Sequence, residues 1–502
     1  MLPHDTKIVP AFQLRETAYA ISREGGRLLA MFANDERPVC GKFVIYCLFA
    51  SDGGTVLVKG LLDRDETPEF PSISPEIPAA AWYEREIRDL FGLKPVGHPD
   101  PRRLVLHENF PDGVHPLRKD FDTRTPIETV GGGEFPMAGV SGEGVFEVPV
   151  GPIHAGIIEP GHFRFSQAGE MMMRLDAKMF FVHRGIEKAV EGQPLADAFY
   201  RVERISGIAS VAHGLAYCQA VESLAGVVPS GRAQYLRALV AEMERLYNHV
   251  GDIGNMCAGI GFAVAIMAGA RMKEAVMQVN DRLTGNRFLR GMVAPGGVRR
   301  DIDAATEQAI RTLLDALEPD FTELVGLFRE NDELLERMNT TGIVPKQAAF
   351  DLGVTGVGAR ASGVDTDYRR DFPYGCYPDL TLSIPVYTAG DVAARLWVRV
   401  DETYACIRLI RQILDQMPEG ELRLPVPSIP AHSSAFGWAE SSQGGVIHWL
   451  MTGKDDTVYR LFVRAAAYPN WPALTVAAPG NIIPDFPLIN KSFELSYACL
   501  DR

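Results

Sequence analysis

The alternation of apolar and polar positions predicts a small mixed domain at the start of the chain. Residues 42–49 and 55–60 are short apolar runs rich in β-branched and aromatic residues, which is typical of strands. The sequence Ser-Asp-Gly-Gly at 51–54 predicts a hairpin turn between them. Residues 79–91 have helical spacing and are followed by Gly92, a common helix terminator. We therefore expect strands and a helix in the first ~120 residues.

Helical periodicity dominates the middle of the sequence, from about residue 165 to residue 345. The clearest case is 233–250, whose apolar positions recur at spacings of three and four: Leu236, Val240, Met243 and Tyr247. Residues 303–339 predict one long helix or a helical hairpin, with the break at Pro319 because proline removes a backbone donor.

Three further segments complete this outline. Residues 343–388 are rich in Gly, Pro and Tyr, so we expect extended structure there. Residues 391–417 predict a helix, and the remainder predicts short strands and turns. The weakly polar run 256–270 has only 15 residues, against about 20 for a membrane span, which predicts a buried helix instead.

A change in composition marks the domain boundary. Gly131–Gly133 and residues 137–144 lack apolar periodicity and predict a linker. We expect an N-terminal α/β domain at 1–124, a linker at 125–144 and a mainly helical domain with flanking short strands at 145–502. The predicted fold class is α+β.

Composition and charge narrow the class of function. The chain is 46% hydrophobic with a net charge of −14, which disfavours nucleic acid and anionic lipid as main partners. Its seven cysteines are scattered, without a C-x-x-C pair, which is typical of a reducing compartment. The first five residues lack the basic start and apolar stretch of a secretory signal. We expect a cytoplasmic chain without a transmembrane segment.

The first dense motif lies at 82–121, with the pattern E-R-E-x-x-D-x-x-G, then G-H-P, then H-P-L-R-K-D. Charge spacing alone predicts a solvated helix surface. The block resembles the 30-kDa-type subunit of complex I and the matching domain of formate hydrogenlyase large subunits. This resemblance implies docking onto neighbouring subunits by eight residues: Glu84, Arg85, Glu86, Asp89, His98, His115, Arg118 and Lys119.

The second motif, residues 151–188, contains His154, Glu159 and His162 near Gly-Pro turns. Residue chemistry alone favours hydrogen-bonded structural histidines over ligands. The segment resembles the entry of the [NiFe] hydrogenase large subunit, which forms part of the quinone pocket in complex I. Ile158 stands where quinone-binding relatives carry a histidine, which weakens a complex I-type quinone reaction.

The third motif, residues 203–213, resembles the hydrogenase pattern R-x-C-G-I-C-x-x-A-H with both cysteines replaced, by Ser206 and Ala209. Nickel and low-spin iron require soft, deprotonated thiolates. A serine hydroxyl stays protonated at neutral pH, and alanine offers no ligand. Gly207 stands at the position of the complex I quinone tyrosine, so the resemblance implies loss of that contact too.

The fourth motif, residues 492–502, resembles the hydrogenase pattern D-P-C-x-x-C-T-D-R. Ser496 replaces the first cysteine and Cys499 keeps the second, so one thiol of four remains. Residue chemistry leaves two interpretations of Cys499, a buried apolar residue or a lone reactive thiol. The resemblance therefore implies no metal bound by this chain.

A fifth motif, residues 437–472, resembles formate hydrogenlyase more than complex I. Gln443 stands at the position of the arginine that lies over the metal in hydrogenases. Four other polar residues of the motif remain: Glu440, Tyr459, Arg460 and Arg464. A buried ion-pair network is at least as good an interpretation of them as a catalytic role.

These motifs favour a large subunit in the peripheral arm of a complex I-related, formate hydrogenlyase-like oxidoreductase, acting in assembly or in redox and ion-translocation coupling. The alternative is a redox subunit whose cavity reduces a quinone or other small acceptor, and hydrogenase activity is disfavoured. Candidate cavity residues are His154, Glu159, His162, Arg204, Gln443 and Cys499.

The resemblance also implies the setting. We expect a small iron–sulfur subunit, a ferredoxin-like subunit, and antiporter-like and anchor membrane subunits as partners. Iron–sulfur clusters would lie in the partners, with no cofactor bound by this chain and no nucleic acid. The predicted location is the cytoplasmic face of the inner membrane.

Overall fold

The computed structural model describes residues 4–51, 54–63, 68–155 and 158–502. Its first layer is a four-stranded sheet in the order β1-β4-β3-β2, with β1 parallel to β4 and the other pairs antiparallel. The strands are β1 (His4–Pro10), β2 (Arg27–Glu36), β3 (Lys42–Ser51) and β4 (Gly54–Asp63). The two predicted strands are confirmed, while residues 52–53 of the predicted turn lie outside the described residues.

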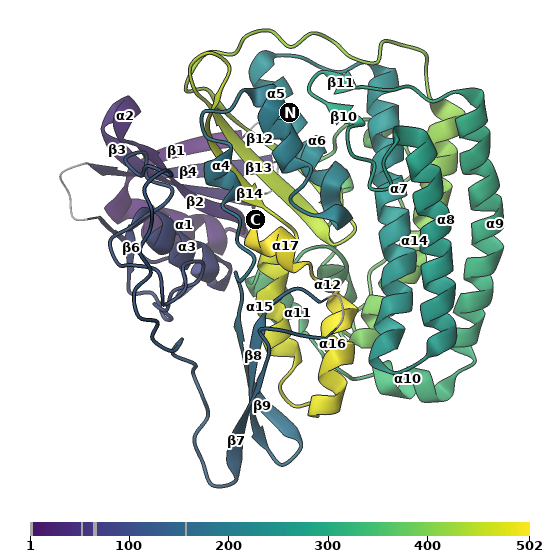
Figure 1. Ribbon diagram of the computed structural model, residues 1–502, viewed down its shortest axis with the longest axis horizontal. Helices are drawn as coiled ribbons and strands as arrows, with labels where there is room; N and C mark the ends of the chain where they lie inside the picture. The colour runs from purple at the N-terminus through teal and green to yellow at the C-terminus, as the bar shows by residue number, and fades with distance from the viewer. Residues whose placement is uncertain (1–3, 52–53, 64–67, 156–157) are drawn as a thin grey trace.

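Two helices accompany this sheet, α1 (Leu14–Arg23) and α3 (Ala81–Phe91) (Figure 1). The predicted helix is confirmed, because α3 ends where Gly92 adopts φ +70°. A Cβ atom at Gly92 would lie 2.3 Å from Nε2 of His115, so both the conformation and the close approach require glycine.

The N-terminal sheet packs against the last sheet of the chain through aromatic rings. Phe32 stacks on Phe462 with centroids 4.2 Å apart, and Tyr46 lies 4.8 Å from Trp449. These rings are almost fully buried, so the two halves share one hydrophobic core.

A three-stranded antiparallel sheet opens the second half, with β7 (Val145–Val150), β8 (His162–Ala168) and β9 (Met171–Lys178). It extends away from the body at the bottom of Figure 1. The helical middle of the chain therefore starts after Lys178 and not at residue 165.

The long helices form a bundle on the opposite side from the N-terminal sheet (Figure 1). They are α7 (Gly231–Met256), α8 (Ala263–Thr284), α9 (Ala304–Arg329) and α14 (Val392–Gln416), while α6 (Ser210–Ala225) lies against the last sheet of the chain. The predicted helices at 233–250 and 391–417 are thus confirmed. Helices α7 and α8 approach closely, since a Cβ atom on Gly269 would lie 2.8 Å from the Cα atom of Gly254.

Two helix predictions are wrong in detail. Pro319 lies inside α9 and does not break it, because the buried Leu317 and Phe321 on either side keep that face packed. The chain breaks later, where the Asn331 side chain accepts a hydrogen bond from the Leu334 backbone and starts α10 (Asp332–Met338).

The run 256–270 is also not one buried helix. The chain turns through η4 (Cys257–Gly259) before α8 begins. On α8, Val264 is 56% exposed and Met267 is 71% exposed. Within the described ranges, no helix has the length and apolar content needed to cross a membrane.

The prediction of extended structure at 343–388 is wrong. The segment contains three short helices, α11 (Lys346–Asp351), α12 (Gly356–Ala361) and α13 (Tyr368–Asp371). Distant contacts stabilise them, as where Asn470 Oδ1 accepts a hydrogen bond from the Thr355 backbone at 2.9 Å. Sequence periodicity carries no signal of such long-range partners.

The chain ends in an antiparallel sheet and three helices. The strands are β12 (Ser434–Ser441), β13 (Gly444–Thr452) and β14 (Val458–Arg464), and the helices are α15 (Ala467–Ala477), α16 (Phe486–Phe493) and α17 (Tyr497–Asp501). Short strands were predicted correctly here, but the helices after Arg464 were missed. Strand β12 packs on α6 so tightly that a Cβ atom at Gly437 would lie 2.0 Å from the Ala216 carbonyl oxygen. The overall class, α+β, is confirmed.

Candidate functional site

Three of the four cysteine-motif positions meet between the start of α6 and the start of α17. Ser206 Oγ lies 3.3 Å from Ser496 Oγ, although the residues are 290 positions apart. Ser496 caps α17 by accepting a hydrogen bond from the Cys499 backbone at 3.0 Å. Ala209, at the fourth motif position, is buried in the short turn η3 (Gly207–Ala209) that follows Ser206. We call Ser206, Ala209, Ser496 and Cys499 the motif cluster.

The thiol of the motif cluster lies beside two buried histidines. Cys499 Sγ lies 3.9 Å from His213 Nε2, and His213 Nδ1 lies 2.9 Å from His448 Nε2. Burial raises the pKa of Cys499 to about 11. Burial, with Arg184 and Arg502 nearby, lowers the pKa of His213 to about 3. At neutral pH the thiol is protonated and no imidazolium is present to activate it.

Helix α7 supports the motif cluster from behind. Tyr247 Oη donates to the Gly207 carbonyl at 2.7 Å, and Asn248 Nδ2 donates to the Ile208 carbonyl at 2.8 Å. Glu244 accepts from the Val211 backbone at 2.7 Å, and burial raises its pKa to about 8. Glu244, Tyr247 and Asn248 were not singled out as site residues from the sequence. The signal that could have indicated them is their spacing of three and four positions within an otherwise apolar helix.

Gln443 lies at the rim of the motif cluster with its amide already engaged. Its Nε2 donates to the Glu494 carbonyl, and the Glu494 carboxylate accepts from Asn255 Nδ2 at 2.6 Å. Burial and the neighbouring Asp252 raise the pKa of Glu494 to about 8. The rim therefore carries an amide where hydrogenases are expected to carry a guanidinium.

The loop with the other predicted cavity residues packs against α17. Glu159 Oε2 accepts a hydrogen bond from the Ala498 backbone at 2.9 Å, next to Cys499. His154 Nε2 donates to the Gly161 carbonyl at 2.7 Å, and His162 Nδ1 to the Gly151 carbonyl at 3.1 Å. One nitrogen of each histidine thus stabilises the loop itself.

Arg204 does not join this group. Its side chain is about half exposed, at 51%, and it pairs with Glu203. It also donates to the Tyr200 carbonyl at 2.8 Å, so its charge stays at the surface.

The predicted docking residues are mostly used inside the chain. Glu84 accepts hydrogen bonds from the Ser72 and Ser74 hydroxyls, and Asp89 accepts from the backbone of residues 104–106. The following five are buried: Glu84, Arg85, Glu86, Asp89 and His98. A solvated helix surface is therefore the wrong interpretation of this motif. The five residues are at most 8% exposed, and docking by them stays a prediction.

The remaining three docking candidates, His115, Arg118 and Lys119, are half-buried. Lys119 Nζ pairs with Glu191 at 2.7 Å and contacts the Tyr459 carbonyl, which ties the N-terminal domain to the rest. Contact with another subunit stays a prediction for these three.

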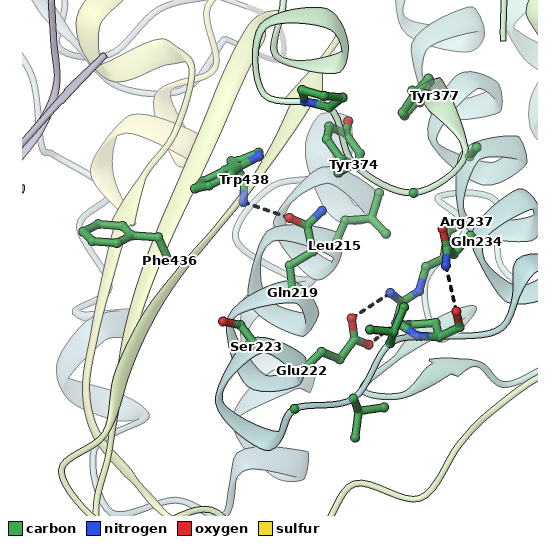
Figure 2. A pocket seen from close by; sticks show the side chains of 17 residues that line it. Leu215, Gln219, Glu222, Ser223, Gln234, Arg237, Tyr374, Tyr377, Phe436 and Trp438 are labelled. Atoms are coloured by element: carbon green, nitrogen blue, oxygen red, sulfur yellow. Dashed lines mark hydrogen bonds and ion pairs between the residues drawn. The ribbon is translucent and has the colours of Figure 1, made fainter. Parts of the chain in front are cut away.

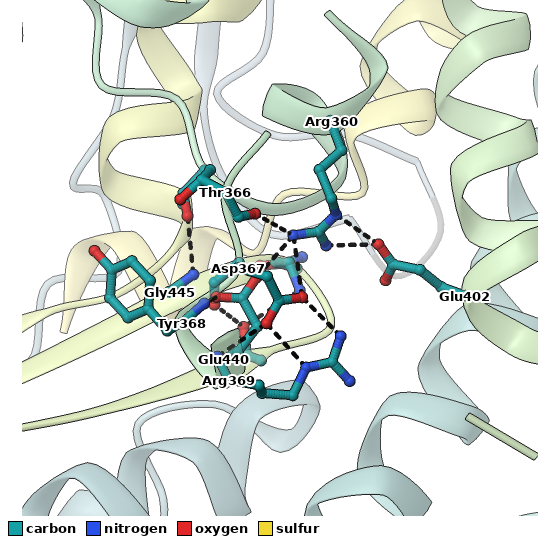
Figure 3. Close-up of polar contacts among 12 residues, drawn as sticks. Arg360, Thr366, Asp367, Tyr368, Arg369, Glu402, Glu440 and Gly445 are labelled. Carbon is teal, nitrogen blue, oxygen red and sulfur yellow. Dashed lines mark hydrogen bonds and ion pairs between the residues drawn. The ribbon is translucent and has the colours of Figure 1, made fainter. Parts of the chain in front are cut away.

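Arginine–carboxylate pairs fill the centre of the second half (Figure 3). Arg360 Nη1 lies 3.1 Å from Glu440 Oε1. Arg460 Nη1 lies 2.8 Å from Glu187, which also binds Arg502 at 2.9 Å. For Glu440 and Arg460 the structure therefore agrees with a buried ion-pair network.

Comparison with known proteins agrees with this fold. The family described as respiratory-chain NADH dehydrogenase 30 Kd subunit matches residues 8–126, and the 49 Kd subunit family matches residues 259–435. The nickel-dependent hydrogenase family matches residues 184–253, which include Ser206 and Ala209. The fold and the motif cluster together define a large subunit of the hydrogenase and complex I class.

Individual relatives align over nearly the whole chain. Hydrogenase-4 component G of Escherichia coli (strain K12) is 36% identical, with 96% of this chain and 85% of the relative covered. Formate hydrogenlyase subunit 5 of the same organism is 37% identical with the same coverage. A chain of the archaeal membrane-bound sulfane sulfur reductase superposes with a TM-score of 0.68 at 28% identity, covering 72% of this chain and 99% of that one. The chain belongs to the family of large subunits that includes these hydrogenase and formate hydrogenlyase components.

The family implies a nickel–iron centre, and the motif cluster does not fit one. Its four positions offer two hydroxyls, one methyl group and a single thiol, where a nickel–iron centre needs several soft thiolates. Over residues 4–51, 54–63, 68–155 and 158–502, no group of three or more His, Cys, Asp or Glu side chains is placed to hold a metal.

Proposed function

We propose that this chain is the large subunit of the peripheral arm of a membrane-bound, complex I-related oxidoreductase complex, without nickel–iron chemistry of its own. The proposal rests on the motif cluster. Its backbone positions come together as the family's motif requires, but only one of the four side chains, Cys499, is a thiol. The chain's relatives are subunits of membrane-bound hydrogenase and complex I-like complexes.

The role that fits these residues is assembly together with redox or ion-translocation coupling. Expected partners are a small iron–sulfur subunit, a ferredoxin-like subunit, and antiporter-like and anchor membrane subunits, at the cytoplasmic face of the inner membrane. Large apolar side chains stand exposed: Ile153 at 80%, and on α8 Val264 at 56% and Met267 at 71%. Exposed apolar groups of this size support contacts with other subunits.

Purification from membranes tests this proposal. The tagged chain, isolated from the membrane fraction of its host, is expected to elute with iron–sulfur and antiporter-like membrane proteins. Met267→Glu on α8 should weaken this association because it places a charge in an apolar contact. Gln278→Glu, an exposed position on the same helix, is the matched control. A chain that elutes alone and monomeric would contradict the proposal.

A second function is favoured by one contact, that of Glu159 with the backbone next to Cys499. In this alternative the cavity between this chain and an iron–sulfur partner reduces a quinone or another small acceptor. Two electrons would come from the partner's clusters and two protons from the loop, with His154, Glu159 and His162 as the donors. The sulfane sulfur reductase among the relatives acts on such a small acceptor.

Turnover of the purified complex separates the two functions. If the cavity is a redox site, acceptor-dependent turnover falls by about 100-fold in Glu159→Gln and in His162→Asn, as for loss of a positioned proton donor. Glu170→Gln, exposed in the turn between β8 and β9 of the same sheet, should leave turnover unchanged. Unchanged turnover in all three variants would reject the second function and leave the first.

A further inference from the structure

Eight buried ionisable side chains form one connected cluster among α7, α12, α13, α14 and β12. None of them is more than 3% exposed. Figure 3 shows its centre, where Arg360 and Arg369 converge on Asp367 and Glu440. We call this set the charge cluster: Glu242, Arg245, His249, Arg360, Asp367, Arg369, Glu402 and Glu440.

Two carboxylates of the charge cluster are strongly paired. Arg360 Nε donates to Glu402 Oε1 at 2.7 Å, and His249 Nε2 lies 2.8 Å from Glu402 Oε2. Asp367 accepts two hydrogen bonds from Arg369, at 3.0 and 2.7 Å. Such forked contacts hold both carboxylates in the ionised form.

Glu242 is the third carboxylate, and it faces three donors. Arg245 Nε lies at 3.1 Å, Arg369 Nη1 at 3.1 Å, and Tyr377 Oη donates at 2.6 Å. Despite full burial, these partners hold the pKa of Glu242 below its ordinary value. Glu242 is therefore also ionised.

Glu440 is the fourth carboxylate and has the weakest support. Its Oε1 lies 3.1 Å from Arg360 Nη1, a guanidinium already bound to Glu402, and its Oε2 accepts from the Tyr368 backbone at 3.2 Å. Burial and the nearby Asp367 raise the pKa of Glu440 to about 7. Glu440 is the position in the cluster where a proton is most readily held.

The charge cluster contains one more carboxylate than it has guanidiniums. The negative groups are Glu242, Asp367, Glu402 and Glu440, and the positive groups are Arg245, Arg360 and Arg369. Burial lowers the pKa of His249, so the imidazole does not supply the missing charge. Fully ionised, the cluster would carry a net charge of −1 in a desolvated interior, which is costly.

The neighbouring charges lie outside the ion pairs of the charge cluster. Arg464 of β14 donates to Tyr368 Oη at 3.2 Å and to the Gly445 carbonyl at 3.0 Å, and among the described residues it forms no ion pair with Glu440. On the next turn of α7, Asp252 pairs with Arg399 at 3.6 Å, which adds no net charge. One bound proton is what makes the charge cluster neutral.

A solvent-open pocket reaches the charge cluster from one side. It has a volume of about 330 Å³ and lies between α6, the start of α7 and β12, lined by Trp438, Tyr374 and Tyr377 among others (Figure 2). Tyr377 is the residue that donates to Glu242, and Tyr374 Oη accepts from the Glu440 backbone at 3.0 Å. Tyr377 can pass its proton to Glu242 and take another from pocket water. Glu242 is joined to Asp367 of the same cluster through Arg369.

We propose that the charge cluster is a proton-binding site that holds one exchangeable proton at neutral pH and exchanges it with solvent through the pocket at Tyr374 and Tyr377. The proton leaves as Glu440 ionises, and no bond other than the O–H bond changes. The four carboxylates share this titration, so it belongs to the cluster as a whole. The site goes beyond the proposed function and does not depend on it.

Infrared difference spectroscopy of the purified full-length chain tests the proton count. In the carbonyl region of protonated carboxylic acids, the wild type should show one band at pH 7 that Glu440→Gln lacks. Glu402→Gln should also lose this band, because three carboxylates then balance three guanidiniums and Glu440 ionises. Glu307→Gln, in an exposed pair with Arg311, is the control without change.

Each outcome decides the proposal. No band lost in Glu440→Gln would show that Glu440 is already ionised and would overturn it. A band lost in Glu440→Gln but kept in Glu402→Gln would show one isolated buried carboxyl and would also overturn it. If Glu402→Gln does not fold, Asp367→Asn makes the same change in charge. The site would be refuted directly if no wild-type band both titrates between about pH 5 and pH 9 and disappears in Glu440→Gln.

Hydrogen–deuterium exchange of the same band tests the route. Tyr377→Phe should slow exchange by about 100-fold, the effect of losing a positioned proton donor. Tyr200→Phe, 45% exposed and outside the pocket, should leave the rate unchanged. An unchanged rate in Tyr377→Phe would overturn exchange through this pocket.

Discussion

Replacing Glu187 tests the claim that buried ion pairs stabilise the second half of the chain. Glu187 on α4 (Ile186–Ala189) binds Arg460 at 2.8 Å and Arg502 at 2.9 Å, and accepts from the Val463 backbone at 2.9 Å. Arg502 also binds Glu86 of the N-terminal domain at 2.6 Å. Glu187→Gln keeps the volume and the backbone contact but removes the negative charge.

The expected loss of stability follows from these partners. Removing one member of a buried pair costs about 3–5 kcal/mol. In the variant Arg502 still binds Glu86, whereas Arg460 loses its carboxylate partner. We therefore expect the loss in free energy of unfolding to lie at the lower end of this range, about 3 kcal/mol. With an unfolding entropy of about 2.1 cal/mol/K per residue over 502 residues, Tm should fall by about 3 °C.

Calorimetry at pH 7 and urea unfolding of both proteins measure this change. Glu307→Gln is the matched control, because its pair with Arg311 is exposed and contributes under about 0.5 kcal/mol. Burial opposes ionisation of Glu187, yet Arg460 and Arg502 hold its pKa below the ordinary value. Its contribution is therefore present above about pH 4.5 and lost as the pH falls. A Tm decrease no larger than in the control would refute the reasoning.

Three further predictions follow from single positions. Gly437→Ala should prevent stable folding, because the added Cβ atom would lie 2.0 Å from the Ala216 carbonyl oxygen; the measurement is the yield of soluble protein. As a control, Gly326→Ala has open space around the added Cβ atom and should raise the free energy of unfolding by up to about 1 kcal/mol. Burial raises the pKa of Glu244 to about 8. Protonated Glu244 therefore contributes to the stability of the fold below about pH 4.5, and this contribution is lost as the pH rises through 8. In Glu244→Gln, the Tm should depend less on pH over that range. A maleimide should label one native cysteine, the exposed Cys40, and all seven after unfolding; rapid native labelling of Cys499 would contradict its high pKa.

Regular periodicity allowed the long elements to be predicted. Residues 233–250 became the centre of α7, where the apolar positions spaced by three and four are buried; the polar positions of 235–250 are buried too, which the spacing did not indicate. Pro319 shows the limit of a local rule, since burial of Phe321 and its neighbours keeps α9 intact across the proline. At Thr355, the stabilising partner Asn470 lies 115 positions away, so no window of sequence contains the reason for that local structure.

The candidate site was predictable to the extent that motifs carry it. Motif spacing pointed to Ser206 and Ser496 together, and the structure places their hydroxyls 3.3 Å apart. Arg204 lies in the same motif, yet its side chain stays at the surface, because motif spacing does not fix side-chain direction. The supports from α7 and the excess carboxylate at Glu440 depend on contacts between distant elements, which a single sequence does not reveal.

Metal quantification of the purified native complex tests the central claim most directly. The motif cluster presents two hydroxyls and a single thiol, which is too few soft ligands for a nickel–iron centre. We therefore expect nickel at background level and no infrared bands from diatomic ligands on iron. Stoichiometric nickel accompanied by such bands would contradict the claim.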